Sequence, residues 1–174
     1  MSSPSGYNRL SVITHWLAAI SVVALFFTHE GPRDSLAFQF HVAGGAVIGL
    51  FLIWRTFHRV ARGFPEKPQQ HVLLNLLSTI VLWGLILAVI VLVITGYLLP
   101  WTIGRPIDFG GVLSIPSPFQ PMRGMHEFME QAHDIAGHII VPLVLLHVAG
   151  ALKHWLFDKG DKKRRMLGSD AGGR

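Results

Sequence analysis

The sequence contains no cysteine among its 174 residues. This absence excludes disulfide bonds, iron–sulfur clusters, zinc–thiolate sites and the covalent haem attachment that a C-x-x-C-H motif provides. Charged residues are also scarce, at 14%, whereas apolar residues make up 51% of the chain. A chain of this size with so many apolar residues is typical of a small helical membrane protein rather than of a soluble domain.

Four apolar stretches predict membrane-spanning helices, because about 20 apolar residues cross the hydrocarbon core as a helix. Their approximate bounds are 10–28, 38–57, 72–99 and 131–157. A cleaved signal peptide is the alternative for the first stretch, but that stretch is long for such a segment and lacks a small-x-small cleavage site. With no internal repeat, we expect one domain over residues 1–174 of the all-α class, an integral membrane four-helix bundle.

Lysine and arginine are distributed unevenly between the two sides of this bundle. With four spans, both termini and the linker between the second and third spans share one side, and the other two loops contain only Arg33, Arg105 and Arg123. The positive-inside rule therefore places both termini in the cytoplasm and the long loop 102–130 outside. Since the basic residues flank apolar spans, the net charge of +5 does not indicate nucleic-acid binding. The basic residues on the cytoplasmic side are Arg9, Arg55, Arg59, Arg62, Lys67, Lys153, Lys159, Lys162, Lys163, Arg164, Arg165 and Arg174.

The last span is unusual because it carries His133, His138, His147 and His154. Ionisable side chains are costly inside a membrane and indicate function. His133 and His147 are fourteen residues apart, a rotation of about 1400° that ends about 40° short of four turns, so both lie on one helix face. Their separation along the axis is about 21 Å. This spacing suits two stacked metal centres.

Two further histidines complete a pair at each depth. His15 lies near the cytoplasmic end of the first span, as His147 does in the fourth, and His41 lies near the outer end of the second span, as His133 does. Two imidazoles from facing helices hold haem iron without covalent attachment. Four glycines beside these histidines would leave room for a flat macrocycle: Gly44, Gly45, Gly137 and Gly150.

The spacing leaves one alternative for the outer ligand. His29 is fourteen residues after His15 and could replace His41, although its place beside Gly31-Pro32 favours a role at the loop edge. His138 is rotated off the ligand face and is expected to pack or to form a hydrogen bond. We expect His58, His71 and His154 in the headgroup layer or in solvent. For His154 the alternative is a place at the edge of the inner haem or on a proton path.

Arg55 lies fourteen residues after His41, on the same helix face and at the depth of the inner pair. Haem propionates are anions, so an inward-facing arginine is a natural partner for them. The alternative is that Arg55 only sets the topology as a charge at the end of a span.

At these residues the chain resembles the bacterial cytochrome b561 family, which is related to the cytochrome b subunits of nickel hydrogenases. The resemblance is carried by YNRLSVITHWL, FHVAGG, FGGVLSIPSP and LHVAGALKHWLFDKGDKKRRML. It implies a multi-pass protein of the bacterial inner membrane that holds two haem b groups. It assigns His15 and His147 to one haem and His41 and His133 to the other, which decides against His29.

The resemblance also implies electron transfer between an outer-side donor, superoxide in some members, and the quinone pool, with ubiquinone as acceptor or donor. This would make the chain a quinone-linked oxidoreductase. The sequence does not choose the side of the quinone site. Candidate residues are Lys153 and His154 on the inner side and, on the outer side, His126, Glu127, Glu130 and Asp134. Arg105 and Arg123 are the two cations of the long loop that could attract superoxide.

Two other functions use the same histidines. The chain could be the haem-bearing anchor of a larger dehydrogenase or hydrogenase, whose redox partner docks on the outer loop. It could also be a metal-ion or proton transporter, which would show no haem chromophore.

Overall fold

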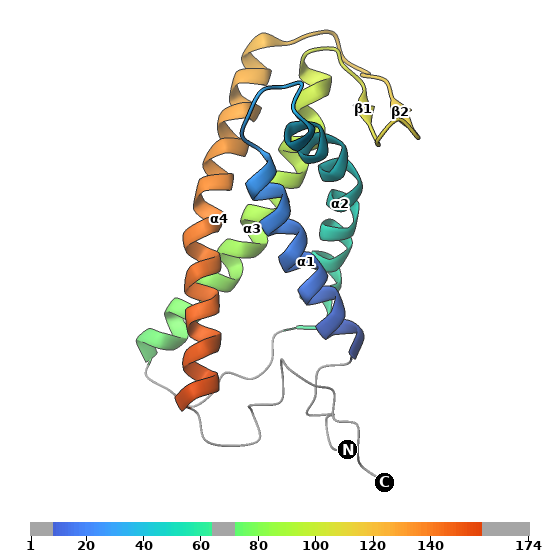
Figure 1. The fold of residues 1–174 in the computed structure, drawn as a ribbon. Coiled ribbons are helices and arrows are strands. Elements are labelled where there is room, and N and C mark those ends of the chain that lie inside the picture. Colours follow the sequence, from blue (N-terminus) through green and yellow to red (C-terminus); the bar gives the residue numbers. More distant parts are fainter. Residues whose placement is uncertain (1–8, 64–71, 158–174) are drawn as a thin grey trace.

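The computed structural model describes residues 9–63 and 72–157, which form four long helices and one short hairpin (Figure 1). All four helices are long and apolar enough to cross a membrane, which confirms the predicted all-α membrane bundle. The elements are α1 (Arg9–Thr28), α2 (Leu36–Ala61), α3 (Val72–Thr102), β1 (Ile107–Asp108), β2 (Ser114–Ile115) and α4 (Arg123–Phe157).

The bundle is an up-and-down arrangement in which each helix packs on the next. α1 packs on α2, α2 on α3, and α3 on α4. The start of α1 and the end of α4 lie at one end of the bundle, and the hairpin lies at the other (Figure 1). The short connection between α1 and α2 reverses the chain at Gly31, which has a φ of 121°, and Ser35 caps α2 by accepting a hydrogen bond from the Phe38 amide at 3.2 Å.

The interior of the described bundle is sparsely filled. Most of its buried residues are small or β-branched, and no large side chain in the described part of the chain is completely buried. Helix bundles normally fill their centre with large apolar side chains at near-crystalline density. Here the large apolar side chains, such as Phe27 and Leu87, instead cover the outer faces, where lipid would contact them. The centre is therefore suited to a bulky apolar cofactor.

α4 begins earlier than its hydropathy indicated, at Arg123 rather than near residue 131. The first two turns of α4 mix polar and apolar residues, so their low mean hydropathy resembles that of a loop. Just before the helix, the amide of Met122 donates a hydrogen bond to the Thr102 carbonyl at the end of α3, at 2.8 Å. The predicted loop 102–130 therefore shrinks to residues 103–122. As a consequence His126 lies on a helix and not in the loop.

The remaining outer loop is structured by the hairpin. Ile107 pairs with Ile115 and Asp108 with Ser114. Gly110 and Gly111 turn the chain with φ values of 67° and 77°, which glycine adopts without strain. Trp101 at the end of α3 donates its indole N–H to the Ile115 carbonyl at 3.3 Å, so the hairpin is tied to the bundle.

Candidate functional site

Two histidine pairs lie at two levels of the bundle. His15 on α1 faces His147 on α4 with ring centroids 6.0 Å apart. His41 on α2 faces His133 on α4 with centroids 6.1 Å apart. All four side chains are half-buried. The structure thus brings together the same partners that depth and spacing predicted, and each pair bridges from α4 to the α1–α2 half of the bundle.

The distances within the pairs suit one metal atom between two imidazoles. A metal–imidazole bond is about 2 Å long. Two such bonds, added to the distance from each bonded nitrogen to its ring centroid, give a centroid separation close to the observed 6.0 and 6.1 Å. Within residues 9–63 and 72–157, no group of three or more histidine, aspartate or glutamate side chains could hold a metal ion. Two protein ligands per site fit haem, whose macrocycle supplies the other four nitrogens.

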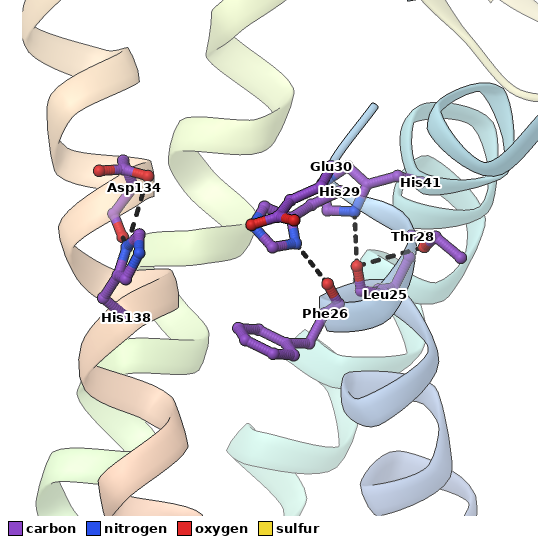
Figure 2. Close-up of polar contacts among 8 residues, drawn as sticks. All are labelled: Leu25, Phe26, Thr28, His29, Glu30, His41, Asp134 and His138. Carbon is purple, nitrogen blue, oxygen red and sulfur yellow. Dashed lines mark hydrogen bonds and ion pairs between the residues drawn. The ribbon is translucent and has the colours of Figure 1, made fainter. Parts of the chain in front are cut away.

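The outer pair is held in the tautomer that a metal ligand needs. The Nδ1 atom of His41 lies 2.8 Å from the Leu25 carbonyl oxygen, so Nδ1–H donates and Nε2 keeps its lone pair (Figure 2). The Nδ1 atom of His133 lies 2.9 Å from Thr95 Oγ1. Because the Thr95 hydroxyl donates its own proton to the Val91 carbonyl at 2.6 Å, it accepts from His133. Such outer-shell partners orient ligands and raise their basicity.

Helix α3 supports the outer pair although it contributes no ligand of its own. Thr95 is buried, and a Cβ added at Gly96 would lie 3.3 Å from His133 Cε1. The absent side chain therefore lets the imidazole lie against α3. Sequence reasoning missed both residues because α3 has no histidine within its span. The only available signal was that Thr95-Gly96 interrupts the apolar run LAVIVLVITGYLLP.

The inner pair has a different partner. Arg55 on α2 reaches His15, with Nη2 3.0 Å from Nδ1. Arginine has only donors, so Nδ1 accepts and Nε2 carries the proton of the neutral ring. Arg55 therefore faces the interior at the depth of the inner pair, as the spacing predicted. Here it forms a hydrogen bond to His15, a predicted haem ligand.

His29 lies close to the outer pair but is held at the loop edge. Its ring centroid is 6.2 Å from that of His41. Its Nδ1 atom contacts the Phe26 carbonyl, and Nε2 lies 3.8 Å from Glu30 Oε1 (Figure 2). These contacts support the expected loop-edge role, and the ring remains near enough to His41 for the alternative to need a direct test.

Three other histidines of the described residues lie away from the two pairs. The side chain of His138 is 71% exposed, and its Nδ1 lies 2.9 Å from the Asp134 carbonyl (Figure 2); it hydrogen-bonds but does not pack. His58 stacks on Trp54 with centroids 5.4 Å apart. His126 contacts Thr102. His71 and the side chain of His154 lie outside the described residues.

The four glycines beside the histidines are not required by helix packing. A Cβ at Gly150 would meet nothing within 4 Å, and one at Gly45 or Gly137 would meet a single leucine methyl at 4.0 Å. A Cβ at Gly44 would touch Phe40 of its own helix at 3.5 Å. Space beside the imidazoles is therefore kept open, which fits a flat cofactor lying across the helices.

A family profile for prokaryotic cytochrome b561 matches residues 6–169. The chain belongs to the prokaryotic cytochrome b561 family. A curated relative, cytochrome b561 homolog 2 of Escherichia coli (strain K12), is 26% identical in an alignment that covers 98% of this chain and 95% of that protein. The chain is accordingly a multi-pass bacterial membrane cytochrome of the b type, with haem b as its cofactor and electron transfer as its role.

Proposed function

We propose that the chain holds two haem b groups, one between His15 and His147 and one between His41 and His133. The observation that carries this proposal is the pair of histidine–histidine contacts, with centroids 6.0 and 6.1 Å apart, at two levels of one bundle. Fourteen residues of α4 separate the two levels, which is about 21 Å along a helix. Two such centres form an electron relay across most of the hydrocarbon core.

The side chains of this chain bind and tune, while the haem supplies the one-electron redox chemistry. Thr95 and the Leu25 carbonyl fix the outer imidazoles through Nδ1. Arg55 lies against His15, one of the two proposed inner ligands, and would be a suitable partner for a propionate of that haem. A His15 that held the haem through Nε2 would carry its ring proton on Nδ1, so the Arg55 guanidinium would leave Nδ1 and would turn to that anion.

The relay connects an outer-side donor with the quinone pool, and ubiquinone is the proposed quinone. The lysine and arginine distribution supports cytoplasmic termini, and a helical bundle is the form in which bacterial inner-membrane proteins span the bilayer. Superoxide is a candidate donor. The outer surface offers Arg105 and Arg123, although Arg123 pairs with Glu127 at 3.0 Å, which weakens its pull on a small anion.

Proteoliposomes test the relay directly. With ferricyanide enclosed and a membrane-impermeant reductant outside, the enclosed ferricyanide should be reduced only when both haems are present. His133→Leu is the matched variant, because it removes one proposed ligand of the outer haem and leaves the inner pair intact. Equal rates for the wild type and this variant would refute transmembrane relay through both centres.

A second candidate is a haem-bearing anchor subunit of a larger complex. The observation that favours it is the outer hairpin, which is fixed to α3 yet exposes Val112 (91%) and Leu113 (55%) at its tip. Exposed apolar residues on an ordered loop are typical of a docking surface. Purification of the chain alone as a stable protein that transfers electrons to quinone would argue against this candidate.

A further inference from the structure

The contact between Thr95 and His133 is repeated one heptad further out. Thr102 follows Thr95 by seven residues on α3, and His126 precedes His133 by seven residues on α4. The Nδ1 atom of His126 lies 2.8 Å from Thr102 Oγ1. The two antiparallel helices therefore carry two threonine–histidine pairs in register, and of these only Thr95–His133 belongs to a proposed haem site.

The second pair fixes the tautomer of His126 in the same way. The Thr102 hydroxyl donates its proton to the Leu99 carbonyl at 2.7 Å, so its oxygen accepts from Nδ1–H of His126. The lone pair of the neutral imidazole is consequently at Nε2. Thr102 is only 3% exposed, and its carbonyl accepts the Met122 amide at 2.8 Å. The acceptor at Nε2 is thus held on a rigid frame.

His126 also has a defined place relative to the outer pair. A seven-residue step is a rotation of about 700°, so His126 and His133 share a helix face, about 10.5 Å apart along the axis. The side chain of His126 is half-buried, and exposed apolar side chains flank it in sequence, Met122 just before α4 and Met125 and Phe128 within it. An apolar molecule bound at His126 would lie next to the outer haem site.

We propose that Nε2 of His126 accepts a hydrogen bond from the hydroxyl group of a hydroquinone-class molecule at the outer end of the relay. A hydroquinone combines an apolar ring with an O–H donor, which matches an acceptor nitrogen beside apolar side chains. Superoxide has no proton to donate to this nitrogen. The inference rests on the proposed quinone-linked function and assigns the outer end to its quinol-binding site.

The test is stopped-flow reduction of the oxidised holoprotein by a short-chain ubiquinol under anaerobic conditions. His126→Phe should raise the half-saturating quinol concentration by about five- to tenfold, because one hydrogen bond to a neutral group is lost. His126→Gln, whose amide oxygen can accept in place of Nε2, should recover part of this loss. Haem content and full reduction by dithionite must match the wild type.

Two further variants separate this role from a merely structural one. His138→Phe makes the same substitution at an exposed histidine of α4 and should leave the half-saturating concentration unchanged. Thr102→Val keeps the imidazole but removes the acceptor of its Nδ1–H, and should raise the half-saturating concentration by about threefold. It also serves if His126→Phe does not fold.

The outcomes are distinct. If His126→Phe and Thr102→Val both match His138→Phe, quinol binding does not use His126 and the inference is wrong, while the quinone-linked function stands. If the ubiquinol does not reduce the wild-type haems and a short-chain ubiquinone does not oxidise the reduced haems either, the quinone-linked function itself is refuted, and the inference with it.

Discussion

The outer and inner histidine pairs have nearly the same ring separation, 6.1 and 6.0 Å between centroids, but different surroundings. In the outer pair both Nδ1 atoms donate to protein oxygens, the Leu25 carbonyl and Thr95 Oγ1, so each Nε2 is ready to bind a metal. In the inner pair Nδ1 of His15 instead faces the Arg55 guanidinium at 3.0 Å. That contact favours the tautomer with the proton on Nε2, where a metal would bind.

The two sites therefore differ in how far their imidazoles are preorganised to bind a metal. The outer site is preorganised, because α1 and α3 supply acceptors in the correct positions before any cofactor is present. To hold the proposed inner haem through Nε2, His15 would have to change tautomer and Arg55 would have to leave Nδ1. Arg55 would then be a cation beside the proposed haem, where a positive charge would stabilise the reduced iron and the propionate anions.

Removing one ligand from each pair should give the largest effect. His147→Leu should abolish the inner haem and leave one haem b per chain, because the outer pair shares no ligand with it. His133→Leu should abolish the outer haem and leave the inner haem bound. Haem quantified per chain, with the potential of the remaining haem, distinguishes the two variants. Two haems in either variant would show that the pairing is wrong.

Removing the acceptor of His133 should weaken the outer site alone. Thr95→Val is expected to lower outer haem affinity by about tenfold or more, in the range found for outer-shell partners of metal-binding histidines. Haem titration of the apoprotein measures this. Thr79→Val is the matched control on the same helix, where the hydroxyl donates to the Asn75 carbonyl. Equal haem affinities for the two variants would show that Thr95 does not support haem binding by His133.

Removing the cation should change the inner site alone. Arg55→Ala is expected to lower the inner haem potential by tens of millivolts, because a nearby positive charge favours the reduced state and 59 mV corresponds to about 1.4 kcal/mol for one electron. Arg55→Lys should retain most of the potential. A redox titration in which both haem potentials match the wild type would leave Arg55 as a topology charge only.

The smallest effect is expected at His29. His29→Leu should leave both haems bound, since the Phe26 carbonyl and Glu30 hold that ring at the loop edge. Loss of the outer haem in this variant, while His41→Leu retains it, would assign the outer ligand to α1 and not to α2.

The sequence predicted the four spans and paired His15 with His147 and His41 with His133, while His29 stayed open as an outer ligand until the family resemblance decided against it. Long apolar runs determine the spans, and the helical period determines which histidines share a face, so both follow from local information. The start of α4 at Arg123 did not follow, because an amphipathic first turn has the hydropathy of a loop. This error also placed His126 in the loop.

The supporting contacts could not be predicted because they depend on which helices are neighbours. The helical period shows that Thr95 and Thr102 share a face of α3, but only the packing of α3 on α4 brings that face to His133 and His126. The same holds for the contact between Arg55 and His15. Helical spacing predicted the depth of this arginine, and the structure shows the His15 imidazole beside it.

A dithionite-reduced minus oxidised visible spectrum of the purified holoprotein, with haem quantified per chain, tests the central claim most directly. Two haem b groups per chain with sharp low-spin bands are expected, since each iron would have two imidazole ligands. One haem per chain would show that one of the two pairs is not a haem site. A folded preparation made with haem available that contains none would contradict the account and return these histidines to ion transport.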